Sequence, residues 1–290
     1  MKTRRSPLSY DVFVSPEKPF TGLPYSIGDS PALDPTSATL IFGERDAVLV
    51  EALCTTREVT ALADWVELHN RRLTTIYITH GHGDHWLGLS VLQKRFPEAH
   101  AVASAGTVGQ MRTYVNGTAL IGRWRGLLPG QISDTLVVAD SLNSDHFELE
   151  GLPLEVIETG RTDGVDTTAL YVPDLGLICS GDGVYNHCHM FLGETTAADR
   201  AEWIAAIDKL AALKPAAVVT GHKDPTQGNP PTVLAECRGY IDYYGQLREK
   251  GLPDRELFDT MVSRYPDWVS RQEWLILGGL FNPRKEKATV

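Results

Sequence analysis

Short apolar runs alternate with amphipathic segments along most of the chain. Residues 39–42 and 47–50 are apolar runs separated by a polar turn, and a further run covers 73–79. Runs of this length, bounded by turn residues, are typical of buried strands. Residues 56–70 instead repeat apolar positions every three or four residues, which predicts an amphipathic helix. The two periods predict strands and helices in alternation.

The same alternation continues towards the C-terminus. Further strands are predicted at 100–103, 136–139, 154–157, 168–172 and 177–179, and further helices at 86–96, 104–114 and 199–213. From 232 to about 280 the pattern is helical, with breaks expected at Pro253 and Pro266. The Pro/Gly-rich segment 16–35 is expected to form a loop or short hairpin near the mouth of the active site. Alternating strands and helices predict the α/β class.

Composition narrows the range of partners. The chain has 290 residues, of which 42% are hydrophobic, enough to bury one large domain with an appendage. Its net charge of −10 argues against nucleic-acid binding, which requires a basic face. No apolar stretch is long enough for a membrane span, and the basic start (Lys2, Arg4, Arg5) lacks the apolar segment of a signal peptide. Four cysteines without a Cys-x-x-Cys pair favour reduced thiols, so a cytoplasmic protein is expected.

One motif concentrates the candidate chemistry. Directly after the run 73–79, the sequence reads His80-Gly81-His82-Gly83-Asp84-His85, which holds three of the nine histidines. Imidazole and carboxylate are the side chains that bind zinc and similar ions. The two glycines allow a tight loop, and the end of a strand is where α/β proteins usually place their chemistry. The motif therefore predicts a metal site.

This motif resembles the signature of the metallo-β-lactamase-fold hydrolases. Two later strand ends extend the resemblance: Asp182 follows the apolar run 177–179, and His222 follows 218–220. The resemblance covers about residues 36–225 and implies a four-layer αββα sandwich. It places a metallo-β-lactamase-fold domain at 1–225 and a C-terminal helical extension, packed on the same domain, at 226–290.

The resemblance also implies the metal ligands. A first site is expected to take His80, His82 and a share of Asp182. A second site is expected to take Asp84, His85, His222 and the other share of Asp182. Zinc is expected rather than iron or manganese. Because only the second site keeps its full ligand set, one tightly held ion is expected, with a weaker first site.

One position departs from the family pattern. The third histidine of the first site should fall within 157–162, where the sequence has Arg161. Guanidinium offers only donors and cannot ligate a metal. Arg161 is expected either to point into the site, pairing with Asp182 or with a substrate oxyanion, or to swing outward. Asp163 and Asp166 follow in the same loop, and either is a candidate replacement ligand.

Four residues are predicted to take part in catalysis. Asp84 would orient the nucleophile, and Arg161 would supply positive charge. Tyr185, three residues after Asp182, matches a tyrosine that reaches the substrate carbonyl in lactonases of this family, although core packing is an alternative. His189 matches a histidine of the family's extended branch, with a surface position as its alternative.

The predicted reaction is hydrolysis of a lactone, lactam, ester or thioester in a small molecule, by metal-bound hydroxide. The alternatives are a mononuclear iron dioxygenase of the same fold and a degenerate member without turnover. The sequence sets neither the substrate nor the oligomeric state.

Overall fold

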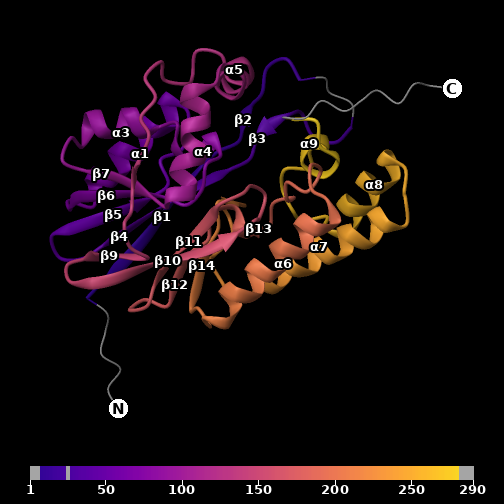
Figure 1. Cartoon of the computed structure of the whole chain (residues 1–290). Coiled ribbons are helices and arrows are strands. Elements are labelled where there is room, and N and C mark those ends of the chain that lie inside the picture. Colours follow the sequence, from indigo (N-terminus) through magenta and orange to yellow (C-terminus); the bar gives the residue numbers. More distant parts are fainter. Residues whose placement is uncertain (1–6, 24–26, 281–290) are drawn as a thin grey trace.

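Two β-sheets lie face to face at the centre of the computed structural model, which describes residues 7–23 and 27–280 (Figure 1). The basic start of the chain, positions 24–26 of the predicted hairpin and positions 281–290 of the predicted extension lie outside the described residues. The larger sheet has the strand order β13-β15-β4-β5-β6-β7-β8, with β1 paired to β4. Its strands are β1 (Ser9–Ser15), β4 (Thr36–Phe42), β5 (Asp46–Val50), β6 (Arg72–Ile78), β7 (His100–Ala103), β8 (Asp140–Ser141), β13 (Tyr185–Asn186) and β15 (His222–Lys223).

The smaller sheet has the order β14-β12-β11-β10-β9. Its strands are β9 (His146–Leu149), β10 (Leu152–Gly160), β11 (Thr167–Val172), β12 (Leu177–Cys179) and β14 (Ala217–Val219). The segment predicted to form a loop or hairpin contains a separate two-stranded ribbon of β2 (Lys18–Pro19) and β3 (Ala32–Leu33).

Helices cover the outer faces of both sheets (Figure 1). The larger sheet carries α1 (Thr56–Leu68), α3 (Leu89–Arg95) and α4 (Ala105–Asn116), and the smaller carries α6 (Ala197–Ala212). Helix α7 (Val233–Glu249) packs beside α6 and against β13. The shorter elements are α2 (Gly83–Trp86), α5 (Thr118–Leu127), the 3₁₀ turn η1 (Gly181–Gly183), α8 (Asp254–Arg264) and α9 (Glu273–Leu277). The result is the four-layer αββα sandwich with C-terminal helices that the sequence predicts.

Successive side chains of one strand pack in two different apolar cores, and this holds the layers together. In β4, Leu40 packs in the apolar core that includes the helices, whereas Ile41 packs in the core between the two sheets. In β5, Leu49 and Val48 divide in the same way, because successive side chains of a strand point to opposite faces. Each of these four residues is fully buried, and burial of such a side chain stabilises the fold by roughly 1.5–3 kcal/mol.

Two predicted elements differ from the structure, and one helix was not predicted. Residues 136–139 form no strand, and the strand beside β7 is the shorter β8. The predicted helix 86–96 is shortened to α3, because Trp86 ends the separate helix α2 and Gly88 lies between the two. A Cβ on Gly88 would stand 2.1 Å from the carbonyl oxygen of Ala52. The sequence pattern gave no sign of α5, in which Thr, Gly and Arg interrupt the apolar periodicity. The predicted division at residue 225 stays a prediction.

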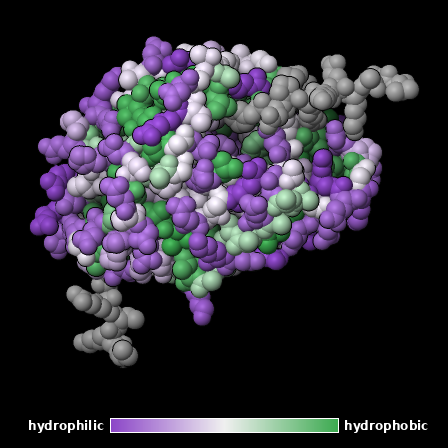
Figure 2. Space-filling model, viewed as in Figure 1, coloured by the Kyte–Doolittle hydropathy of each residue, from purple (hydrophilic) through white to green (hydrophobic). Residues whose placement is uncertain are grey.

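The strand ends that carry the motifs meet at one edge. The motif of residues 80–85 follows β6, while Asp182 and His222 follow β12 and β14, which pair in parallel. On the face seen in Figure 2, hydrophilic residues cover much of the surface and hydrophobic ones lie in several separate patches. Within the described part of the chain, no helix has both the length and the apolar character needed to cross a membrane.

Candidate metal centre

Asp182 stands at the centre of the clustered histidines. Its Oδ2 lies 3.7 Å from His80 Nε2 and 3.2 Å from His222 Nε2, and its Oδ1 lies 3.2 Å from His85 Nε2. The side chain is 3% exposed. One carboxylate therefore reaches histidines that come from two different strand ends, as a bridging ligand must.

Two glycines permit this close approach. A Cβ on Gly221 would stand 2.0 Å from Asp182 Oδ1, so the backbone before His222 can pass the carboxylate only without a side chain. Gly181 has φ +50°, and a Cβ there would meet Thr79 Oγ1 at 2.2 Å. The strand–glycine–ligand pattern seen in the sequence thus has a steric cause.

The second site consists of Asp84, His85, His222 and Asp182, all buried. Asp84 Oδ2 lies 3.4 Å from His85 Nε2 and 3.3 Å from His222 Nε2. One ligand atom from each residue falls within 4.8 Å of the others. The structure brings together the complete ligand set that the resemblance implies for this site.

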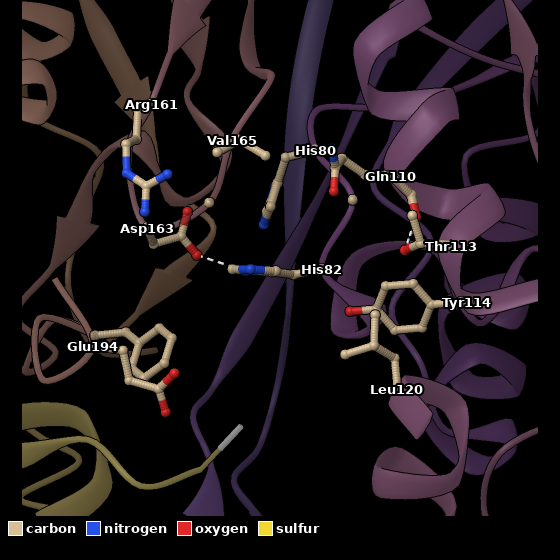
Figure 3. Close-up of a pocket in the computed structure, with 13 residues that line it drawn as sticks. His80, His82, Gln110, Thr113, Tyr114, Leu120, Arg161, Asp163, Val165 and Glu194 are labelled. Carbon is tan, nitrogen blue, oxygen red and sulfur yellow. Dashed lines mark hydrogen bonds and ion pairs between the residues drawn. The ribbon is translucent and has the colours of Figure 1, made fainter. Parts of the chain in front are cut away.

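The first site contains an additional residue. His80, His82 and Asp182 gather as expected, and Asp163 joins them with its ligand atom inside the same 4.8 Å limit. Asp163 Oδ2 lies 2.7 Å from His82 Nδ1, and the Asp163 side chain is 1% exposed (Figure 3). One of the two acidic residues considered as a replacement ligand therefore points into the site.

The cluster has the chemical features of a cation site. Among the described residues, no hydrogen bond of normal geometry reaches His80 Nε2, His85 Nε2, Asp163 Oδ2 or Asp182 Oδ1, all of which are buried. Buried polar atoms are normally satisfied, and atoms that face one another without hydrogen bonds fit a shared metal partner.

Protonation of the metal-free cluster differs between its histidines. Burial lowers the pKa of His222, but Asp182 outweighs burial and raises it to about 10. Burial also lowers the pKa of His82, but the Asp163 carboxylate outweighs it and raises this pKa to about 9. Burial and the neighbouring His85 lower the pKa of His80. His82 and His222 must therefore release protons when they bind a metal.

Glu51 is a supporting residue that the sequence analysis missed. Its Oε2 lies 3.6 Å from His85 Nδ1, on the side of the ring away from Asp182, and its Oε1 accepts a hydrogen bond from Thr79 Oγ1 at 2.5 Å. A carboxylate behind a histidine ligand fixes the ring orientation and raises its basicity. The available signal was its place directly after β5, at the same edge as the ligands.

Arg161 does not pair with the bridging carboxylate. Its Nε lies 2.6 Å from Oδ1 of Asp199, at the start of α6, so the proposed contact with Asp182 was wrong. The side chain is 34% exposed and lines the cavity beside His80 and Asp163, which leaves contact with substrate as a proposal (Figure 3).

Tyr185 and His189 lie in different environments. The Tyr185 hydroxyl donates to Asp182 Oδ2 at 3.3 Å, and its ring stacks on His222. His189 is buried, with Nδ1 2.9 Å from the Tyr240 hydroxyl and its ring edge against Trp268. His189 is not at the surface, and its packing among aromatic residues gives no geometric support for a catalytic role.

A cavity of about 260 Å³ opens onto the first site (Figure 3). Its wall carries His80, His82 and Asp163 beside polar and apolar side chains: Gln110, Thr113, Tyr114, Leu120, Arg161, Val165, Phe191 and Glu194. A smaller recess reaches the second site and is lined by Asp34, Asp84, Tyr185 and His222 among others. The space large enough for a small molecule therefore lies beside the first site.

Comparison with known proteins decides the family. The model of the metallo-beta-lactamase superfamily matches residues 31–222. The chain belongs to this superfamily. Its members are generally metal-dependent hydrolases, and the cluster described above supplies the His and Asp ligands that such a protein needs. Comparison with curated protein sequences gave no match.

Solved structures of the superfamily share the fold. A metallo-beta-lactamase from Pontibacter korlensis is 18% identical, with 81% of this chain and 99% of that chain covered and a TM-score of 0.58. A metallo-beta-lactamase family protein from Thermus thermophilus is 19% identical, with 93% and 92% covered and a TM-score of 0.62. At 18–19% sequence identity, these similarities show a shared fold.

Proposed function

We propose that this protein hydrolyses the carbonyl bond of a small lactone, lactam, ester or thioester, with zinc as its metal. The main support is that His80, His82 and Asp163 of the metal-ligand cluster line a cavity of about 260 Å³. The Tyr185 hydroxyl lies beside Asp182, the proposed bridging ligand. This volume lies near the lower end for small-molecule sites, which favours a compact substrate over a polymer. The net charge of −10 further disfavours nucleic acid.

Tyr185 is the proposed electrophilic residue. Burial and the nearby Asp182 carboxylate hold the pKa of the phenol well above its usual range. The hydroxyl therefore keeps its proton at neutral pH and can turn from Asp182 to the oxygen of a reacting carbonyl. A donor placed where negative charge develops typically lowers the barrier by several kcal/mol.

Asp182 and Asp84 are proposed to bind the metal, and Asp84 is also proposed to transfer a proton. Asp182 and Asp84 have pKa values well below their usual range, where burial is opposed by His222 and His85, so both are ionised. Asp84 Oδ2 is placed to receive a proton and pass it to the leaving group. A divalent ion at these ligands would lower the pKa of bound water and polarise the carbonyl.

The predicted cytoplasmic location is part of the same proposal. All four cysteines are buried and free of disulfides, which suits a reducing compartment.

The test is a substrate panel with the zinc-loaded protein. Chromogenic lactones, β-lactams, acyl esters and thioesters would be compared with a phosphodiester, using wild type and Tyr185→Phe. We expect turnover of a carbonyl substrate and a loss of about 100-fold in kcat for Tyr185→Phe. Turnover of the phosphodiester alone would refute the proposed bond type.

A mononuclear iron dioxygenase is the second candidate, because His80, His82 and Asp163 form a set of two histidines and one carboxylate. Such sets hold iron in oxygenases. Oxygen uptake by the iron-loaded protein, in the absence of any hydrolysis, would favour this candidate.

A further inference from the structure

The loop after β10 carries a buried carboxylate, Asp163, that the family's ligand pattern does not include. Its side chain is 1% exposed, and its Oδ2 faces His82 Nδ1 at 2.7 Å without normal hydrogen-bond geometry. A carboxylate oxygen at this depth is normally satisfied by hydrogen bonds or by a cation. Its position beside His80 and Asp182 indicates that the partner is shared with them.

The local backbone explains why Asp163, and not residue 161, reaches the site. The pairing of β10 with β11 shifts register between Glu158 and Gly160, and Gly160 adopts φ +75°. This left-handed residue redirects the chain, so that Arg161 meets Asp199 on α6. The ion pair anchors the loop on the side of the cavity next to α6, and Asp163 follows two residues later.

One oxygen of Asp163 is held and the other is left for a ligand. Oδ1 accepts a hydrogen bond from Thr162 Oγ1 at 3.0 Å, and the Thr162 amide donates to the Gly164 carbonyl at 2.9 Å. These bonds fix the carboxylate with Oδ2 directed at the histidines. A supporting hydrogen bond to a ligand carboxylate is the usual arrangement around a metal.

The other acidic residue of the loop is used elsewhere. Asp166 is exposed, and its Oδ2 accepts a hydrogen bond from Gln110 Nε2 at 3.1 Å. Asp166 therefore serves as a matched control, because it has the same side chain in the same loop.

We infer that Asp163 is the third protein ligand of the first metal site, in the place where the family has a histidine. The inference rests on the proposed metal-dependent function and deepens it. The first site then has two histidines, one terminal carboxylate and the bridging Asp182, so that it holds a complete ligand set. Carboxylate oxygen suits harder ions than imidazole does, so this site should accept manganese more readily than a three-histidine site would.

Metal content separates the inference from the function. Wild type, Asp163→Asn, Asp163→His and Asp166→Asn would be stripped of metal, titrated with zinc or manganese by calorimetry, and measured for bound metal by elemental analysis. We expect two zinc ions per chain in wild type and Asp166→Asn. Asp163→Asn should hold one and bind the other on the order of 100-fold more weakly, since it loses a ligand. Asp163→His should hold two zinc ions and lose affinity for manganese.

Each result decides the question. One ion in wild type, or two tight ions in Asp163→Asn, overturns the inference. If Asp163→Asn binds none, Asp163→His decides: two zinc ions support the inference, and fewer overturn it. Failure of the substrate panel with these metal contents intact would reject the proposed reaction but leave the ligand assignment in place.

Discussion

The two metal sites share Asp182 but differ in how they are built. The ligand residues of the second site are all buried and stand at strand ends or in the short α2, and Glu51 supports the site from behind. The first site faces the cavity, and its proposed third ligand, Asp163, comes from a loop that is redirected by Gly160. The departure from the family's ligand pattern therefore lies at the site that borders the cavity, while the second site keeps the family's residues.

The largest expected effect concerns the shared and enclosed ligands. Asp182→Ala should lose both metals, and His222→Ala should lose the second metal, so both should reduce hydrolysis to background. His69→Ala and His146→Ala are the controls, because His69 contacts Asp11 and His146 contacts Asp145, both away from the cluster. They should stay within a few-fold of wild type. Unchanged turnover in His222→Ala would contradict the metallohydrolase proposal.

The next prediction uses proton release to separate the sites. In the metal-free protein the pKa of His222 is about 10 and that of His85 lies well above its usual range, where burial is outweighed by Asp182. The second site must thus lose two protons on binding metal, and the first only the proton of His82.

Zinc affinity should accordingly fall with decreasing pH between pH 8 and 6, by about tenfold per pH unit for each proton released. Calorimetry in buffers of different ionisation enthalpy would count these protons. If both sites released the same number of protons, the predicted difference in histidine protonation between the two sites would be wrong.

A smaller effect is expected behind the second site. Glu51→Gln keeps the shape of the side chain but removes the charge that supports His85, so metal affinity at that site should fall by roughly 10–100-fold. The first site should change less, because Glu51 is linked to His80 by hydrogen bonds through the Thr79 hydroxyl. Competition with a chromogenic chelator would measure both affinities. Equal weakening of the two sites would contradict this view of Glu51.

The sequence predicted the two sites unequally, for a physical reason. In the second site, Asp182 and His222 each come directly after a glycine that follows an apolar strand. This pattern predicts that both residues lie at strand ends. The third ligand of the first site depends on a register shift and a left-handed glycine in β10, and counting residues does not reveal either. The sequence consequently left Asp163 and Asp166 as alternative replacement ligands, and only the folded loop favours Asp163.

The same limit applies to supporting residues and to elements without strong periodicity. Glu51 has no motif of its own, and only the folded contact with His85 identifies it. His189 was placed by resemblance at the active site, but Tyr240 of α7 and Trp268, in the segment between α8 and α9, pack against it. Tyr240 and Trp268 lie about 50 to 80 residues after His189 in the sequence, so the local sequence pattern does not predict these contacts.

The smallest effect is expected at Arg161, and it distinguishes a substrate contact from a metal substitute. If Asp163 is the third ligand, as inferred above, Arg161→His should bind no more metal than wild type, although the family pattern has a histidine at this position. Arg161→Ala should also keep its metals, since the guanidinium pairs with Asp199 and not with Asp182.

If the exposed part of the guanidinium holds a substrate carboxylate or oxyanion, Arg161→Ala should raise KM for anionic substrates by about tenfold, with little change in kcat. Asp199→Asn is the matched variant: it removes the partner of Arg161 but leaves the cation beside the cavity. A neutral ester of the same size should show no difference between these variants. Loss of one metal in Arg161→Ala would instead mean that the ion pair with Asp199 is needed to hold Asp163 in place.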